Sequence, residues 1–482
     1  MSKVLYISSE ACPFIKTGGL GDVAGSLPKA LLEQAQDVRL LLPAYSEVLK
    51  NTQKTKKIAV ATYYNLSVQI LETCLPDSKL VVWLVDCPAL FIRSGGPYMD
   101  DNGHEWHDNA LRFAVFCHMA VDIALNNLQL NWRPDVVHCN DWQTGLVPAL
   151  LSMKRERPAT VFTIHNLAYQ GLFDRQTFID LQLPNELWQM DGLEFYDQLS
   201  FIKGGIVYAD KVTTVSPNYA DEILLPKYSY GLAGVLKKRH KDLSGILNGI
   251  DEMLWNPNTD NYIKKTYNQH SLNNKRTNKI KLQKELSLPI DRTIPVLGII
   301  SRLVDQKGFD IILQSLPSLI TLQVQLIVLG TGDKHYEIKL AEWSQVYPEY
   351  IKVIIDFNEA LAHQIEAASD IFIMPSTFEP CGLNQLYSLR YGTIPVVTPV
   401  GGLADTVTDA SKENIANNTA NGVVLTEHTC TALLVAIKRA LSLYKKPKTW
   451  RQLQMTAMSG DFSWQTSAAR YITLYQQAIE KR

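Results

Sequence analysis

The chain lacks the charge imbalance that is typical of proteins that bind polyanions. Its 482 residues hold 47 lysines and arginines against 48 aspartates and glutamates, which gives a formal net charge of −1. Without a global positive field or a long basic run, a nucleic-acid partner is disfavoured. Low-complexity tracts and repeats at solenoid periods are also missing, so the composition indicates an ordinary globular protein.

Paired cysteines and long hydrophobic runs are missing as well. Seven cysteines are scattered along the chain without a C-x-x-C pair, which argues against a disulfide framework and against a zinc site. No 18 apolar residues follow one another, and the N-terminus turns polar after four apolar residues, unlike a signal peptide. The sequence predicts a soluble, cytoplasmic protein and leaves its oligomeric state open.

What the chain does have is an alternation of short apolar runs with helical patterns, which is typical of doubly wound α/β domains with parallel sheets. Its length requires at least two domains. A polar connection after Asp251 and a terminal helical pattern divide the chain into residues 1–250, 251–460 and 461–482. The expected strands lie at 3–9, 38–43, 79–86, 135–141, 159–166, 211–217, 244–250, 294–303, 325–332, 351–357, 370–376, 394–399 and 422–425.

Open parallel sheets bind ligands beyond the carboxyl ends of their strands, so the loops there are the candidate sites. One such loop places Glu379 after an apolar strand and Cys381, Gly382 and Leu383 at the expected start of a helix. Free amides at a helix start attract phosphate or sugar oxygens, and a carboxylate can face developing positive charge. The same residues are also compatible with a plain strand-to-helix turn that Glu379 caps.

A glycine-rich loop at residues 10–23 offers a second candidate. Gly18 and Gly19 let the backbone approach a ligand, Lys16 adds a cation, and Asp22 stands where it can cap the following helix. The loop is neither a dinucleotide fingerprint nor a P-loop, because no G-K-[ST] follows. A turn in which Asp22 only caps the helix is the alternative.

Two cations, Arg302 and Lys307, lie five residues apart in a third post-strand loop. The arginine fork and the lysine point charge together suit the two phosphates of a nucleotide diphosphate, although surface lysines and arginines are common.

Histidines and aromatic residues complete the candidates. His165 and Asp141 end neighbouring buried strands, where they can meet sugar hydroxyls, and a lone histidine can equally be a core residue. Tyr98 and Trp142 lie in loops, and Phe357 is either a stacking or a core residue. A G-x-S-x-G nucleophile elbow is missing, which disfavours a serine hydrolase.

Together these residues resemble the bacterial glycogen synthases and plant starch synthases, which are retaining glucosyltransferases of the GT-B fold. The resemblance covers nearly the whole chain. It rests on the segments KTGGLGDV, Tyr98–Arg112, HCNDWQTG, TIHNLAYQG, LNGID with WNP, SRLVDQKGFD, GTGD, FEPCGLNQLYSLRYGT, GGLADTV and DFSW.

The resemblance implies two Rossmann-like domains, with the C-terminal helix packed back on the first. It implies ADP-glucose as the donor substrate, an α-1,4-glucan such as glycogen as the acceptor, and no metal or other cofactor. In the first domain, Lys16, Gly18 and Gly19 would approach the donor. The residues near the glucose or the acceptor would be Asp22, His165 and Asn166, with Tyr98, Asp141 and Trp142 as further acceptor-side candidates.

In the second domain, the resemblance implies that Arg302 and Lys307 neutralise the departing diphosphate and that Phe357 stacks on the base. Glu379 would stabilise the anomeric centre while the amides of residues 381–383 hold sugar oxygens. The implied reaction is glucosyl transfer to the 4-hydroxyl of the glucan with retention of configuration. Same-face attack and a covalent intermediate both stay open.

Two other functions remain as alternatives at this point. One is a related GT-B enzyme with a small-sugar or oligosaccharide acceptor, and the other is a glycan-binding relative without turnover. Thr377 and Thr398 stand where many relatives have arginine, which puts acceptor or nucleotide affinity in question but leaves the catalytic assignments unchanged.

Overall fold

The computed structural model describes residues 1–76 and 78–482. The chain forms two compact units, one made of Met1–Gly249 with Trp464–Arg482 and the other of Ile250–Ser463. The C-terminal segment thus belongs to the first unit. In the part of the chain that the structure describes, no helix is both long and apolar enough to cross a lipid bilayer.

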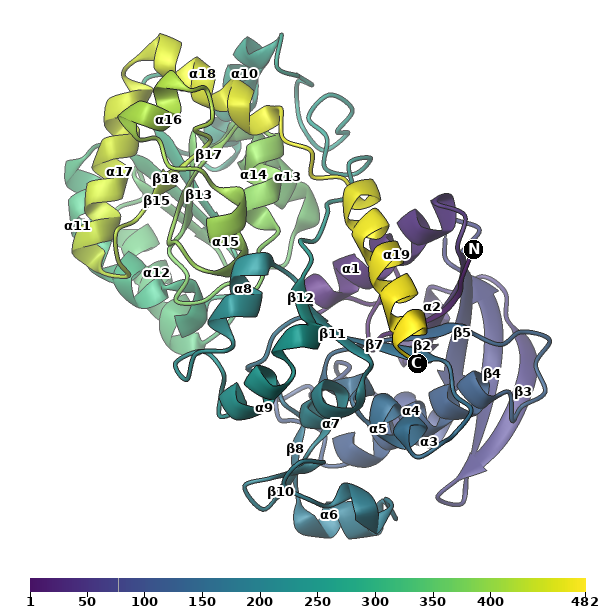
Figure 1. Ribbon diagram of the computed structural model, residues 1–482. Coiled ribbons are helices and arrows are strands. Elements are labelled where there is room, and N and C mark those ends of the chain that lie inside the picture. Colours follow the sequence, from purple (N-terminus) through teal and green to yellow (C-terminus); the bar gives the residue numbers. More distant parts are fainter. Residues whose placement is uncertain (77) are drawn as a thin grey trace. The chain divides into compact units, whose positions relative to one another are not determined.

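The first unit is built on a large mixed sheet with the strand order β12-β11-β7-β6-β1-β2-β5-β4-β3 (Figure 1). A small second sheet has the order β8-β10-β9. The strands are β1 (Lys3–Ile7), β2 (Asp37–Pro43), β3 (Lys56–Tyr63), β4 (Leu66–Cys74), β5 (Val81–Asp86), β6 (Val136–Asn140), β7 (Ala159–Ile164), β8 (Leu172–Asp174), β9 (Glu194–Phe195), β10 (Gln198–Ser200), β11 (Lys211–Thr214) and β12 (Leu243–Gly245). The helices are α1 (Gly19–Glu33), α2 (Ser46–Lys50), α3 (Pro88–Phe91), α4 (Asn109–Leu125), α5 (Leu146–Ser152), α6 (Arg175–Asp180), α7 (Phe201–Tyr208), α8 (Pro217–Glu222), α9 (Ala233–Lys238) and α19 (Trp464–Lys481).

The antiparallel hairpin β3–β4 at the edge of this sheet was not expected from the sequence. Strand β3 contains only exposed and half-buried residues, and β4 interleaves polar with apolar residues, so the hairpin lacks the long apolar runs of the parallel strands. Parallel strands buried on both faces do carry such runs, which is why the seven parallel strands were visible in the sequence and the hairpin was not.

The second unit has a parallel sheet with the order β15-β14-β13-β16-β17-β18. Its strands are β13 (Val296–Ile300), β14 (Gln325–Leu329), β15 (Ile351–Ile354), β16 (Ile371–Met374), β17 (Ile394–Val397) and β18 (Val423–Val424). Its helices are α10 (Lys275–Glu285), α11 (Phe309–Thr321), α12 (Lys334–Val346), α13 (Glu359–Ala368), α14 (Asn384–Arg390), α15 (Gly401–Thr406), α16 (Lys412–Ala416), α17 (Cys430–Tyr444) and α18 (Pro447–Met458).

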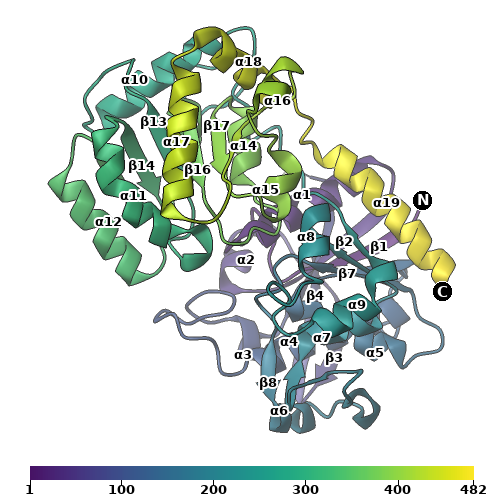
Figure 2. The same ribbon diagram turned by 60° about the vertical axis from the view of Figure 1, so that its left-hand side comes forward.

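Helices cover both faces of this second sheet (Figure 2). Leu297 and Ile299 of β13 share a core cluster with α11 and α17, whereas Val296 shares another with α10 and α13. Successive strand residues point to opposite faces, so these clusters lie on the two sides of the sheet. Both faces of β13 are therefore buried, as its apolar sequence predicts.

The polar stretch after Asp251 is more ordered than the loose connection that the sequence indicated. The Trp255 ring stacks between His363 and Tyr387, with ring centroids 3.8 Å from each. The Asp260 carboxylate accepts from the Tyr391 hydroxyl at 2.6 Å and lies 2.9 Å from His363 Nδ1. A few buried aromatic and charged groups thus fix a segment whose average composition is that of a loop.

The first unit is closed by α19, whose side chains reach the sheet through a buried histidine. His138 of β6 contacts the Tyr475 hydroxyl through Nδ1 at 2.8 Å and the Thr163 hydroxyl through Nε2 at 2.7 Å. Burial lowers the pKa of His138 to about 3, so the ring is neutral. The His138 side chain is fully buried and contacts α19, so it is a structural residue of the core.

We expect Tyr475→Phe to lower the free energy of unfolding by about 1 kcal/mol, because it removes the hydroxyl that contacts His138 and keeps the ring. The matched control is Tyr196→Phe, since Tyr196 is 78% exposed. Urea denaturation measures both variants. Equal stability of the two variants would contradict a stabilising contact between His138 and α19.

Candidate active site

The loops after β1 and β6 leave the first sheet where its strand order reverses direction. Strand β1 pairs with β2 on one side and with β6 on the other. Loops that leave such neighbouring strands diverge to opposite faces and leave room for a ligand, which is the usual binding position in open α/β sheets.

Glu10 organises the glycine-rich loop that follows β1. Its carboxylate accepts hydrogen bonds from the Thr17 amide at 2.5 Å, the Thr17 hydroxyl at 2.7 Å and the Tyr98 hydroxyl at 2.5 Å. The side chain is buried. Sequence reasoning missed this residue, although a carboxylate ahead of a glycine-rich loop was a visible signal.

Lys16 and Asp22 meet across this loop, with Lys16 Nζ 2.7 Å from an Asp22 carboxylate oxygen. Helix α1 begins at Gly19 with Gly18 as its N-cap residue, so the prediction that Asp22 caps the helix was wrong. Asp22 lies inside the first turn, where its charge suits the helix dipole. The helix begins earlier than expected because glycines, which break helices elsewhere, are tolerated in a first turn.

The ends of β6 and β7 bring Asp141, His165 and Asn166 together. The Asp141 Oδ1 atom accepts hydrogen bonds from the His165 amide at 2.7 Å and from the Asn166 amide at 3.4 Å. His165 Nε2 lies 2.9 Å from Asn140 Oδ1. Asn140 was not among the residues that the sequence singled out.

Burial sets the charges of this cluster. It lowers the pKa of His165 to about 3, so the imidazole is neutral. It raises the pKa of Asp141 to about 7, against the two amide hydrogen bonds, and the nearby charge of Glu10 raises it further. The neutral ring can accept or donate a hydrogen bond to a sugar hydroxyl.

The two aromatic candidates differ in their surroundings. The Tyr98 hydroxyl contacts Glu10 and also Ser9 at 2.7 Å. Trp142 is buried and packs edge-on against Phe113, with ring centroids 5.0 Å apart. Trp142 is therefore a core residue beneath the loop and presents no open face for stacking on a sugar.

In the second unit, β13 lies between β14 and β16 at the reversal of strand order. The loop after β13 carries Lys307, and the loop after β16 carries Glu379. Lys307 Nζ lies 2.5 Å from Glu379 Oε2, which also accepts from the Ser376 hydroxyl at 3.0 Å. The two residues that the sequence assigned to different parts of one donor are in direct contact.

Glycines hold the loops around Glu379 close together. Gly308 has a positive φ of 75°, and a Cβ there would lie 2.2 Å from the Pro375 carbonyl oxygen. Gly401 has a φ of 42°, and its Cβ would lie 1.9 Å from the Glu379 carbonyl oxygen. Any larger residue at either position would push the neighbouring loop away.

The helix after Glu379 starts later than the sequence predicted. It begins at Asn384 and has seven residues, so Cys381, Gly382 and Leu383 precede it and do not form its first turn. Gly382 has a φ of 71°, which turns the chain before the helix. Gln385 Nε2 donates to the Cys381 carbonyl at 2.9 Å and to the Gly382 carbonyl at 3.0 Å, which ties this turn to the first residues of α14.

The other two predicted donor-site side chains of the second unit, Arg302 and Phe357, lie in exposed loops. Arg302 is exposed directly after β13. Strand β15 ends at Ile354, and Phe357 beyond it is 74% exposed, which removes the alternative that it belongs to the core. Thr398 is buried and its hydroxyl donates to the Ser376 carbonyl at 2.5 Å, whereas Thr377 is exposed.

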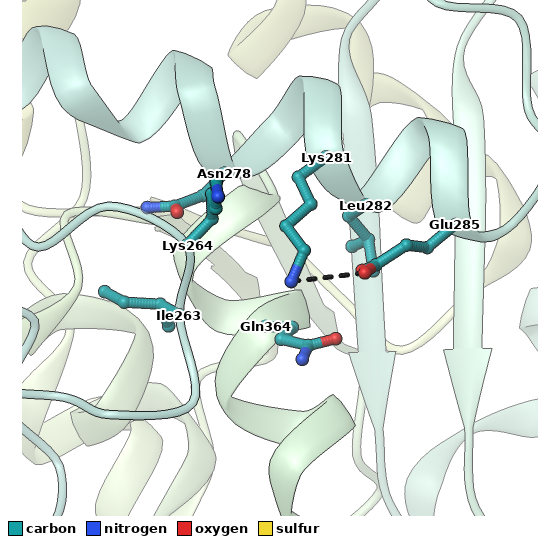
Figure 3. Close-up of a pocket in the computed structure, with 7 residues that line it drawn as sticks. All are labelled: Ile263, Lys264, Asn278, Lys281, Leu282, Glu285 and Gln364. Atoms are coloured by element: carbon teal, nitrogen blue, oxygen red, sulfur yellow. Dashed lines mark ion pairs between the residues drawn. The ribbon is translucent and has the colours of Figure 1, made fainter.

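One pocket of the second unit lies apart from these residues. Figure 3 shows a pocket of about 10 Å³ between α10, α13 and the connecting segment, where Lys281 pairs with Glu285 at 3.1 Å. That volume is about enough for one water molecule.

In the described residues, histidines, cysteines and carboxylates nowhere group in threes as metal ligands. No disulfide joins the seven cysteines, all of which are described.

Comparison with known protein families shows to which class of proteins the chain belongs. Residues 3–238 match the model of the starch synthase catalytic domain, and residues 282–453 match that of the glycosyl transferases group 1 family. The match covers both units and the loops that hold the candidate residues. The chain is thus a glycosyltransferase with the GT-B fold.

Relatives that match over nearly their full length show to which family of glycosyltransferases the chain belongs. The chain is 53% identical to a glycogen synthase of Cellvibrio japonicus over 98% of its length and 99% of the relative's, and 51% identical to glycogen synthase 1 of Methylococcus capsulatus over 99% and 97%. The solved catalytic domain of starch synthase IV from Arabidopsis thaliana, bound to ADP and acarbose, is 32% identical with a TM-score of 0.91 and 99% coverage of both chains. The chain belongs to the bacterial glycogen synthase and plant starch synthase family.

One more solved structure shares only the fold. Sucrose-phosphate synthase from Thermosynechococcus elongatus is 16% identical to this chain, with a TM-score of 0.61 over the full length of both.

We expect Asp141→Asn to be more stable than the wild type at neutral and higher pH, because asparagine keeps the acceptor for the two amides and removes a buried ionisable group. The folded-state pKa of Asp141 lies above its unfolded value, so the folded protein holds a proton that the unfolded chain releases. The stability of the wild type should therefore fall as the pH rises toward about 7.

Urea denaturation at about pH 5 and about pH 8 measures this effect, and the advantage of the variant should grow between them by on the order of 2 kcal/mol. A pH-independent difference between the two proteins would show that Asp141 is ionised at both pH values.

Proposed function

We propose that this protein acts as a glycogen synthase, which transfers glucose from ADP-glucose to the non-reducing 4-hydroxyl of an α-1,4-glucan with retention of configuration. The observation that carries the proposal is the contact between Lys307 and Glu379 at the carboxyl ends of β13 and β16. A cation for the departing diphosphate and a carboxylate for the glucosyl centre are the two charges that this transfer needs.

On the donor side, Arg302 and Lys307 would bind the diphosphate and Phe357 would stack on the base. The exposure of Arg302 and Phe357 supports these roles, because neither side chain is used by the core. Glu379 is buried, so its charge acts through a low-dielectric environment and is less screened than a surface carboxylate. The amides of residues 381–383 would hold sugar oxygens.

In the first unit, we assign His165 and Asn166 to the transferred glucose and Lys16, with the backbone of Gly18 and Gly19, to the donor. Asp22 pairs with Lys16 and would orient it. Tyr98 and Asp141 remain the acceptor-side candidates. Trp142 would support them from the core, since its ring is packed against other aromatic residues.

The side-chain cations replace a metal in this proposal, and the cytoplasm is the proposed location because the seven cysteines form no disulfide, as is usual in a reducing compartment. The test incubates the purified full-length protein with ADP-glucose or UDP-glucose and with glycogen, maltotriose or no acceptor, and measures nucleotide release. ADP release that requires glycogen and persists with a chelator is the expected result.

Other outcomes of this assay point to the alternatives. Release only with maltotriose would indicate a small-acceptor enzyme, release that stops with the chelator would indicate a metal, and glycogen binding without release would indicate a non-catalytic glycan-binding protein.

We expect Glu379→Gln to lower kcat by roughly 10²–10³-fold, because it removes the charge that faces the glucosyl centre. ADP affinity by calorimetry should change only a few-fold. The matched control is Glu337→Gln, which removes another lysine-paired carboxylate of the same unit, 2.6 Å from Lys334. A kcat loss of similar size in both variants would remove the catalytic assignment of Glu379.

We expect Arg302→Ala to weaken ADP binding at least tenfold and Arg302→Lys to restore it only partly, because lysine lacks the fork that matches phosphate. Calorimetry with ADP measures both variants. The control is Arg439→Ala, since Arg439 pairs with Asp409 in the same unit. Wild-type ADP affinity in Arg302→Ala would place the phosphates elsewhere.

A further inference from the structure

The orientation of the Asn140 side chain is fixed by a backbone carbonyl. Asn140 Nδ2 lies 2.9 Å from the Ile7 carbonyl oxygen, which can only accept a hydrogen bond. The amide group must therefore point its nitrogen toward Ile7 of β1. Asn140 Oδ1 then faces the Tyr6 hydroxyl at 3.1 Å and His165 Nε2 at 2.9 Å.

This orientation decides the tautomer of His165. Asn140 Oδ1 has only lone pairs to offer, so the hydrogen atom of the contact must lie on His165 Nε2. The buried ring is neutral and carries a single N–H. His165 Nδ1 is then unprotonated, and among the described residues it has no hydrogen-bond partner, so it is an acceptor available to a ligand.

Tyr6 strengthens the same arrangement. Burial raises the pKa of the Tyr6 hydroxyl well above its ordinary value, so it remains a donor to Asn140 Oδ1. Asn140 is fully buried, and the partners of its side-chain amide lie on β1, on β6 or directly after β7. The group that holds the His165 ring is thus part of the rigid sheet.

His138 lies two residues before Asn140 on the same strand and provides the contrast. Both of its ring nitrogens contact protein hydroxyls, those of Tyr475 and Thr163, so it has none left for a ligand. His165 uses one ring nitrogen for the sheet and keeps the other. The two histidines are both buried and neutral, and they differ in the number of ring nitrogens that the protein occupies.

We propose that Asn140 is a positioning residue, which fixes His165 as the Nε2–H tautomer so that Nδ1 accepts a hydrogen bond from a hydroxyl of the transferred glucose. The sugar part of this inference rests on the proposed function. The tautomer itself depends only on the contacts of the unliganded protein.

The first test is nitrogen NMR of the protein labelled with ¹⁵N-histidine, with the His165 signals assigned by their loss in His165→Gln. In the wild type, Nδ1 should resonate as an unprotonated nitrogen and Nε2 as a protonated one. Tyr6→Phe removes only the second donor to Asn140 and should leave this pattern unchanged. A protonated Nδ1 in the wild type would overturn the proposal.

The second test is a double-mutant cycle of Asn140→Leu and His165→Ala, measured as kcat for transfer from ADP-glucose to glycogen. We expect Asn140→Leu to lower kcat by roughly 10–100-fold through a misplaced ring and to add nothing once His165 is alanine. Fully multiplicative losses would overturn the proposal, because Asn140 would then act independently of His165.

The control is Thr163→Val, which removes the hydroxyl partner of His138 from β7 and should keep kcat near the wild-type value. If the wild type transfers no glucose at all, the proposed function fails, while the NMR result still decides the tautomer.

Discussion

The structure depends on one constraint, the parallel pairing of strands on either side of the point where the strand order reverses. In the first unit this pairing joins β1 to β6, and in the second it joins β13 to β16. Each pair ends in loops that carry polar side chains, so residues more than 70 positions apart meet, as Lys307 and Glu379 do. The apolar strands have no chemical role themselves, but they fix the distances at which the polar groups act.

The charges of the side chains at the two strand-order reversals differ between the units. In the first, burial keeps His165 neutral and raises the pKa of Asp141, so the cluster is suited to hydrogen bonds with hydroxyl groups. In the second, a lysine and a carboxylate remain in contact, and an exposed arginine lies nearby in sequence. The first arrangement suits uncharged hydroxyl groups, and the second suits a charged ligand.

The sequence was a good guide to every strand that is buried on both faces, because such strands carry continuous apolar runs. It did not reveal the β3–β4 hairpin, whose half-exposed residues give a weaker signal, or the anchoring of Trp255 and Asp260, which depends on partners more than 100 residues away.

The sequence motifs identified Lys16, Arg302, Lys307 and Glu379 as candidate site residues, because only a few loops follow buried strands. The motifs do not show which residues surround each side chain in the folded protein. Trp142 looked like a loop residue and is packed in the core, and Asn140 looked like strand sequence and holds the His165 ring. Helices α1 and α14 begin at Gly19 and Asn384, and both starts differ from the predicted ones. The reason is that glycine residues near a helix start are compatible with more than one boundary.

The most direct test of the proposed glucosyl transfer follows the anomeric carbon through the reaction. ADP-glucose labelled with ¹³C at the glucose C1 is mixed with the enzyme and glycogen, and carbon NMR records the product while ADP release is measured in parallel. We expect an α-1,4-glucan signal that grows as fast as ADP appears. A β-linked product, or labelled free glucose in place of extended glucan, would contradict it.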